Sequence, residues 1–67
     1  MIVFQVNDMT CGHCVATITK VVKAADPSAQ VRIELDRHLV MIEPGITDAK
    51  KLEAVIQEAG YTPARQS

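Results

Sequence analysis

Two cysteines, Cys11 and Cys14, are separated by two residues and are the only thiols in the 67-residue chain. A strand-like run at residues 2–6 leads into the pair, and a helix-like run at residues 15–25 leads out of it. The second cysteine therefore lies at or near a helix N-terminus, where unpaired backbone N–H groups and the helix dipole favour a thiolate over a thiol. Two soft anionic ligands on one short loop are typical of a site for a thiophilic metal ion.

A structural disulfide is a weak interpretation of this pair, because a bridge across two residues closes too short a loop to constrain the unfolded chain. The chain has no apolar run of about 20 residues that could span a membrane. Gln5, Asn7 and Asp8 interrupt the apolar segment that a signal peptide would need. We therefore expect a cytoplasmic protein, and in that reducing compartment a lone Cys-x-x-Cys is metal-binding or redox-active. We also expect a free-standing protein, since Met1 comes directly before the first strand.

The number of ligands narrows the choice of metal. A structural Zn(II) site needs four ligands in a tetrahedron, whereas this chain offers two thiols and one neighbouring imidazole. Two thiolates satisfy Cu(I), and Hg(II) by similar chemistry, and they leave the ion open to a third ligand from a partner. The residues alone leave mercury, zinc, cadmium and silver open beside copper.

Three further residues bear on the site, and a second histidine is expected far from it. His13, between the cysteines, is interpreted as a solvent-facing loop residue, with the alternatives of a third metal ligand or of a cation that lowers the thiolate pKa. Met9 is expected to support the loop from beneath as core filler. Tyr61 has two open interpretations: the edge of the core, or a hydroxyl beside the thiolates that supports the site. His38 is expected in a solvated hairpin turn at the far end of the molecule.

Hydrophobic periodicity predicts the elements that position these residues. Residues at alternate positions in 2–7 are apolar, and apolar residues recur at spacings of three and four in 14–25. Gly60 suits the C-terminal cap of a second helix, and Pro63 places the last strand at a sheet edge. In chain order we predict a strand at 2–7, a loop at 8–13, a helix at 14–25, strands at 31–35 and 39–42 joined by a turn at 36–38, a second helix from Thr47 or Asp48 to about Ala59, and a short strand within 61–64.

The order βαββαβ predicts an α+β, ferredoxin-like open-faced sandwich, in which two helices cover one face of a four-stranded antiparallel sheet. One domain is expected over residues 1–67. In this topology the first strand is central and delivers the cysteine loop to one end of the sheet, where the turn after Gly60 also arrives. The predicted core consists of Phe4, Val6, Ile18, Val22, Val31, Ile33, Val40, Ile42, Leu52 and Ile56.

Met9-Thr10-Cys11-x-x-Cys14 within βαββαβ resembles the heavy-metal-associated (HMA) domain family, which includes small copper chaperones and the N-terminal domains of soft-metal P-type ATPases. The pair Gly60-Tyr61 is similar to that of the bacterial copper chaperones. The resemblance implies Cu(I) held by Cys11 and Cys14. It also implies a partner that is a metal-transporting P-type ATPase, its metal-binding domains, or a metal-responsive regulator. Two positions depart from the family pattern: Asp8 replaces a usual Gly, and residues 26–28 replace a frequent Gly-Val turn.

The leading hypothesis is accordingly a Cu(I) metallochaperone that transfers its ion to a partner dithiol by ligand exchange, and not an enzyme. The alternatives are a thiol-disulfide oxidoreductase that uses the same cysteines, and a carrier or buffer of mercury, zinc or cadmium. A net charge of −1 and only two aromatic residues argue against nucleic-acid binding. We expect no membrane insertion and a monomer, with a metal-bridged dimer as the alternative.

Overall fold

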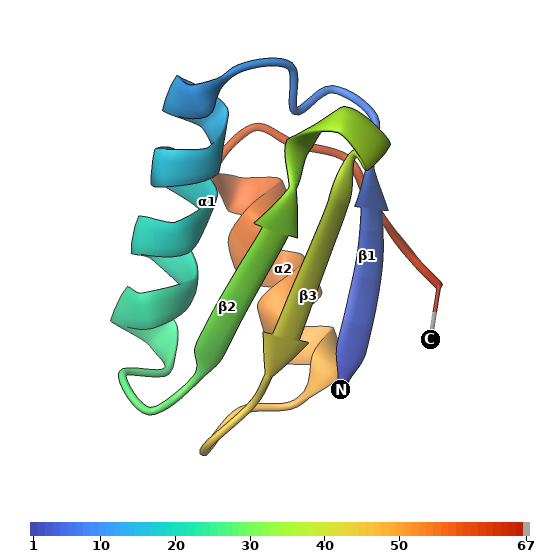
Figure 1. Cartoon of the computed structure of the whole chain (residues 1–67). Helices are drawn as coiled ribbons and strands as arrows, with labels where there is room; N and C mark the ends of the chain where they lie inside the picture. The colour runs from blue at the N-terminus through green and yellow to red at the C-terminus, as the bar shows by residue number, and fades with distance from the viewer. Residues whose placement is uncertain (67) are drawn as a thin grey trace.

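The computed structural model describes residues 1–66, which form one antiparallel sheet with both α-helices on the same face (Figure 1). The strand order is β2-β3-β1-β4, so β1 is central and β4 lies at an edge. This confirms the predicted ferredoxin-like fold. The predicted domain spans residues 1–67, and its last residue, Ser67, lies outside the described residues. The elements are β1 (Ile2–Val6), α1 (Gly12–Ala25), β2 (Gln30–Glu34), the 3-10 turn η1 (Leu35–Arg37), β3 (Leu39–Glu43), α2 (Ala49–Glu58) and β4 (Pro63–Arg65).

Helix α1 begins two residues before the predicted start, at Gly12 instead of Cys14. The apolar stripe that predicts the helix starts only at Val15, and the first turn carries none of the signals that usually mark a helix start. Helix α2 begins as predicted, and the structure selects Asp48 as its N-cap: the Asp48 carboxylate accepts a hydrogen bond from the Lys51 N–H at 2.9 Å. Within the described residues, no helix has the length and apolar character needed to cross a membrane.

The core lies between the sheet and the two helices, as predicted. Phe4 pairs with Val40 and Ile2 with Ile42 across β1 and β3, and these inward side chains are buried. Burial of each such side chain contributes about 1.5–3 kcal/mol. The other buried hydrophobic residues are Val6, Met9, Ile18, Val22, Ala29, Leu52 and Ile56. Val31 and Ile33 pack against this core but are only partly buried, because β2 is an edge strand.

Asp26 is a buried carboxylate, which the sequence did not predict because carboxylates are usually exposed. Its Oδ2 accepts hydrogen bonds from the N–H groups of Gly45 (2.8 Å), Ile46 (3.0 Å) and Thr47 (3.1 Å) and from the Thr47 hydroxyl (2.8 Å). Its Oδ1 accepts from the Ser28 hydroxyl at 2.9 Å. Burial raises the pKa of Asp26, but these hydrogen bonds outweigh it and hold the pKa well below its usual range. Asp26 thus joins the end of α1 to the loop before α2.

The prediction for His38 was wrong. Because β1 and β3 are antiparallel, the end of β1 pairs with the start of β3, and the turn before β3 lies beside the cysteine loop (Figure 1). His38 adopts a left-handed conformation with φ 55° and is only partly exposed. Its Nδ1 lies 2.8 Å from the carbonyl oxygen of Met9, and its own carbonyl accepts from the Val6 N–H at 2.8 Å. A carbonyl can only accept, so Nδ1 carries the proton.

Candidate metal centre

The thiol sulfurs of Cys11 and Cys14 lie 3.7 Å apart at the start of α1. Cys11 is the N-cap, with an extended backbone (φ −153°, ψ 172°), and its side chain is exposed. Cys14 is the third residue of the helix; it is half-buried and packs against the core. Both are free thiols. The predicted position of the second cysteine at the helix N-terminus is therefore confirmed, and the pair combines one exposed sulfur with one anchored sulfur.

The first turn of α1 creates an environment that favours anions. The first hydrogen bond of the helix runs from the Val15 N–H to the Cys11 carbonyl, at 3.3 Å. The N–H groups that precede it in a helix have no carbonyl partner within the helix, and the dipole adds a partial positive charge there. The first turn of α1 carries no acidic residue that would compete for this charge. The local backbone therefore stabilises a thiolate.

Tyr61 reaches the cysteines through the C-terminal cap of α2. Gly60 has φ +100°, a conformation that favours glycine, and its N–H donates to the Gln57 carbonyl at 3.0 Å. The Tyr61 N–H donates to the Ile56 carbonyl at 3.4 Å. These two bonds form a Schellman motif, which reverses the chain after α2. The reversal brings the ring of Tyr61 to the cysteine end of the molecule.

Tyr61 and Cys14 influence each other directly. A hydrogen bond with the Tyr61 hydroxyl is the largest of the effects that lower the pKa of Cys14 from its usual 9.0 to about 7. The backbone of Thr10 and the neighbouring Cys11 also lower the Cys14 pKa, while partial burial opposes them. The same hydrogen bond, burial and the thiolate charges raise the pKa of Tyr61, so its hydroxyl stays protonated and donates. Tyr61 also packs against the core, so the core-edge interpretation is confirmed, and support of the thiolates by its hydroxyl stays a prediction that these pKa shifts favour.

Thr17 is a residue near the site that the sequence analysis did not single out. It is half-buried, and its nearby hydroxyl acts to lower the pKa of Tyr61, against the larger effects that raise it. Its hydroxyl also donates to the His13 carbonyl at 3.0 Å. The spacing in the sequence could have indicated Thr17, because a residue three positions after Cys14 lies on the same face of the helix.

His13 and Met9 occupy different environments. His13 is the second residue of α1 and is exposed, in line with the solvent-facing interpretation; its role as a third ligand stays a prediction. Met9 is fully buried beneath the loop, as predicted. In the part of the chain that the structure describes, no group of three or more His, Cys, Asp or Glu side chains is arranged to hold a metal ion. The residues that the fold brings together are the two cysteines and Tyr61.

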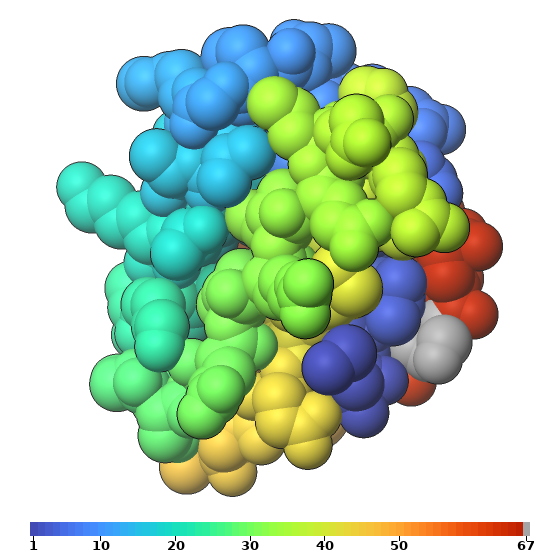
Figure 2. Space-filling view, in the orientation of Figure 1, coloured from blue at the N-terminus to red at the C-terminus, as the bar shows by residue number. Residues whose placement is uncertain are grey.

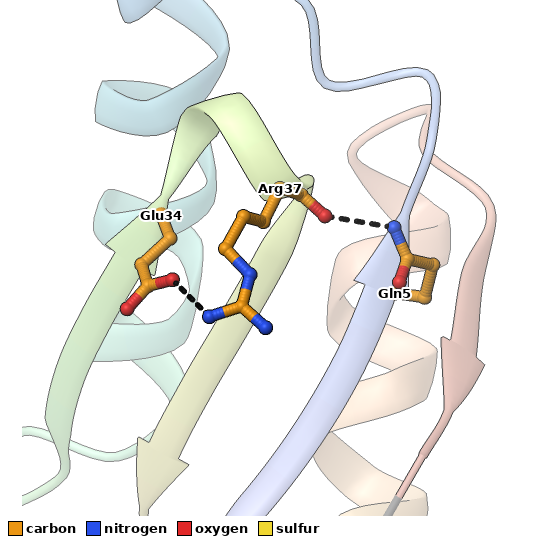
Figure 3. Close-up of polar contacts among 3 residues, drawn as sticks. All are labelled: Gln5, Glu34 and Arg37. Atoms are coloured by element: carbon orange, nitrogen blue, oxygen red, sulfur yellow. Dashed lines mark hydrogen bonds and ion pairs between the residues drawn. The ribbon is translucent and has the colours of Figure 1, made fainter.

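The segment before the cysteines is held from two sides. On one side, the η1 turn packs against it (Figure 2), and the Gln5 amide donates to the Arg37 carbonyl at 2.9 Å (Figure 3). Arg37 in turn pairs with Glu34 at 3.2 Å. On the other side, the Asp8 carboxylate accepts from the Thr62 N–H at 3.2 Å. The cysteine loop is thus anchored to both neighbouring turns.

Comparisons with known proteins agree with this geometry. The model of the family "Heavy-metal-associated domain" matches residues 3–62. The "Copper-transporting ATPase 2" of Rhizobium meliloti (strain 1021) is 34% identical over 59 residues, which are 85% of this chain but 7% of the ATPase. A solved gold binding protein is 33% identical with a TM-score of 0.93, covering 98% of this chain and 100% of the other. The copper chaperone Atx1 from Synechocystis PCC6803, a mutant in a trimeric form, is 28% identical with a TM-score of 0.91, covering 96% and 100%.

Proposed function

This chain belongs to the heavy-metal-associated domain family, and we propose that it binds Cu(I) between Cys11 and Cys14 and passes the ion to a partner dithiol by ligand exchange. One observation carries the proposal: two free thiols lie 3.7 Å apart at one end of the fold, one of them exposed. Thiolates select soft ions such as Cu(I), and a site with two ligands leaves the ion accessible to a third. The copper-related relatives support copper as the cargo.

The sulfur separation bears on how the ion is held. With metal–sulfur bonds of about 2.3 Å, two sulfurs 3.7 Å apart enclose an angle of about 107° at the metal. A linear arrangement needs the sulfurs about 4.6 Å apart, so the pair has to open by roughly 0.9 Å. Cys11 is free to make this movement, because it lies outside the helix and is exposed, whereas Cys14 is held in α1. A bent site is open on one side to a thiolate from a partner.

The same asymmetry sets the order of release. A partner thiolate joins the ion first, and a three-coordinate intermediate forms before either of the chain's own cysteines departs. Cys11 leaves early because the exposed ligand is easier to displace. Cys14 leaves late because it is anchored against the core and its pKa of about 7 keeps much of it as thiolate at neutral pH.

Cu(I) competition tests the site. In the presence of excess glutathione and a chromophoric Cu(I) chelator, the chain should bind one Cu(I) per molecule. Cys11→Ser and Cys14→Ser should both lose this tight binding, since one thiolate does not hold the ion against competing thiols. His13→Ala is the matched control within the same loop, and unchanged affinity is expected if this side chain faces solvent. Equal affinity of the wild type and both cysteine variants would refute the proposed site.

A mixed-complex experiment tests the order of release. Cys11→Ser, which retains Cys14, should still form a metal-bridged complex with a dithiol partner domain. Cys14→Ser should form much less of that complex. Equal yields from the two variants would contradict the order while leaving the carrier function intact.

The partner we propose is a copper-transporting P-type ATPase, its metal-binding domains, or a metal-responsive regulator, and the setting is the cytoplasm. The proposal is of a monomeric carrier of one domain without catalytic activity. Competition with Ag(I), Hg(II), Zn(II) and Cd(II) in the same assay ranks the ions. A Cys14 pKa of about 7 also suits a thiol-disulfide oxidoreductase. Weak Cu(I) binding together with a measurable dithiol–disulfide cycle would favour that alternative.

A further inference from the structure

We propose that the outer edge of β2 pairs, antiparallel, with the same strand of a second copy of this chain, so that two sheets join into one. This inference goes beyond the proposed function and does not depend on it. The two edge strands of the sheet differ (Figure 1). β4 has three residues and begins with Pro63, and both features discourage a further strand from pairing with it. β2 has five residues, Gln30–Glu34, and contains no proline, glycine or lysine.

The hydrogen bonds of the sheet fix the direction in which the backbone groups of each strand point. In a strand, the N–H and C=O groups of successive residues face alternate sides. The N–H of Gln66, directly after β4, donates to the Val3 carbonyl at 2.7 Å, so the backbone groups of Val3 face β4. Those of Phe4 therefore face β3, where Phe4 is paired with Val40. The backbone groups of Val40 face β1 in return.

The alternation continues from β3 into β2. Met41 follows Val40, so its backbone groups face β2, where it is paired with Arg32. The backbone groups of Arg32 face β3, and those of Val31 and Ile33 on either side of it point away from the sheet. In the described part of the chain, no loop or turn hydrogen-bonds to the Val31 or Ile33 backbone. These two residues offer two donors and two acceptors to a further strand.

The side chains of β2 differ between the two faces of the sheet. Val31 and Ile33, on the helix side, pack against the core but are only partly buried, as is Leu35 directly after the strand. Arg32 and Glu34 alternate with them and lie on the face without helices. A second copy of β2 would therefore bring apolar side chains to the first set and charges of both signs to the second.

Three antiparallel registers bring the outward backbone groups of two copies together, and two of them are unfavourable. A register centred on Val31 uses the carbonyl of Ala29, which already accepts a hydrogen bond from the Lys23 ammonium. A register centred on Arg32 places the two Arg32 side chains opposite each other. Like charges directly opposite on a sheet are destabilising.

The third register is centred on Ile33, and it is the one that the charges favour. It pairs the backbone groups of the two Ile33 residues and places Arg32 opposite Glu34 of the second copy, twice by symmetry. Within its own chain the Glu34 Oε1 lies 3.2 Å from the Arg37 guanidinium, which leaves Oε2 for Arg32 of the second copy. The partly exposed apolar side chains of the two strands cover one another on the helix side.

This pairing leaves both cysteine pairs accessible. β2 runs in the same direction as β1, because each is antiparallel to β3, so β2 ends at the cysteine end of the sheet. In an antiparallel pair of β2 strands the two cysteine ends point in opposite directions, and no metal ion joins the copies. One short strand buries less than about 1,200 Å², the range of weak and transient contacts. The dimer is therefore in equilibrium with the monomeric carrier.

The test uses the metal-free protein with a chelator and a reductant, so that neither a metal ion nor a disulfide joins two copies. The apparent mass in analytical ultracentrifugation should rise towards that of a dimer between about 0.05 and 1 mM protein. Over the same range, hydrogen exchange of the Ile33 amide should slow. Exchange of the Arg32 amide, which faces β3, should change less.

Charge reversal tests the register. Arg32→Glu and Glu34→Arg should each weaken self-association at least about tenfold, because each places like charges opposite each other. An equimolar mixture of the two variants should associate again, because both positions of the mixed dimer then pair Glu with Arg. Lys50→Glu, the same charge change on an exposed residue of α2, is the matched control and should associate like the wild type. Thermal unfolding of each variant checks that it is folded.

A monomer throughout the concentration range would overturn the inference. So would association that persists in both single variants, or that their mixture does not restore. Stronger association of Arg32→Gln than of the wild type would also overturn it, because that result indicates the register in which two Arg32 side chains meet. Association that needs Cu(I) and disappears in Cys11→Ser would place the contact at the metal centre and refute pairing through β2.

Discussion

Replacement of Tyr61 by Phe removes one hydroxyl and keeps the aromatic ring, so it isolates the hydrogen bond to Cys14. We predict that the pKa of Cys14 rises from about 7 to about 8. The direction follows from the site: the Tyr61 hydrogen bond is the largest of the effects that lower this pKa from 9.0 to about 7, the Thr10 backbone and the side chain and backbone of Cys11 also lower it, and burial opposes them. Folding should be unaffected, since the ring of Tyr61 still packs against the core.

The assay is the pH dependence of iodoacetamide alkylation in a Cys11→Ser background, where Cys14 is the remaining thiol. Because Cys11 also lowers the Cys14 pKa, the reference is the Cys11→Ser protein itself, and the alkylation rate at pH 7 should be about fivefold lower once Tyr61→Phe is added. Thr62→Ala is the matched control, because it changes the adjacent exposed side chain and leaves the backbone N–H to Asp8 intact.

We also expect Tyr61→Phe to shift the pH dependence of Cu(I) binding to higher pH. A metal ion must displace the proton from Cys14, so the apparent Cu(I) affinity falls as the pH drops below the pKa of this thiol. The part of this fall that comes from Cys14 should begin near pH 7 in the wild type and about one pH unit higher in Tyr61→Phe. Coincident alkylation profiles for the two proteins, or a lower midpoint in Tyr61→Phe, would refute the assigned role of the hydroxyl.

Three further predictions concern the fold and the support of the loop. Leu52→Ala should lower the free energy of unfolding by about 2–5 kcal/mol in urea titrations, because this side chain is fully buried. Ile33→Ala should lower it by less than about 2 kcal/mol, because its side chain is only partly buried; equal losses would contradict the edge position of β2. Asp26→Asn should lower the melting temperature at pH 7 by about 10 °C. Because the pKa of Asp26 is lower in the folded than in the unfolded protein, its carboxylate stabilises the fold fully above about pH 4, and this contribution is lost as the pH falls further. The stability of Asp26→Asn should therefore be less sensitive to acid than that of the wild type. Parallel stability–pH curves for the two proteins would argue against this. His38→Gly keeps the left-handed turn but removes the donor to the Met9 carbonyl, so amide exchange in the cysteine loop and Cu(I) release should both accelerate; unchanged exchange would show that the imidazole does not hold the loop.

Much of the fold was predictable because it depends on local patterns. Alternating apolar residues marked the strands, and the spacing of Ile18 and Val22 marked the buried face of α1. Gly60 acts through its positive φ and Pro63 through its missing N–H, so the helix cap and the edge strand followed from residue type. The cysteine pair, its place at a helix N-terminus and the burial of Met9 followed in the same way.

The sequence by itself therefore determined which face of each element is buried, where the chain turns and which two thiols lie together. Only the tertiary structure decided which turns meet. The antiparallel pairing of β1 with β3 brought His38 to the cysteine loop, and the return of the chain after α2 brought Thr62 to Asp8 and Tyr61 to Cys14. The burial of Asp26 also depends on a loop that lies about 20 residues away in sequence. Periodicity encodes which face of an element is buried, whereas hydrogen bonds between turns depend on strand register and on how the ends of separate elements come together in space.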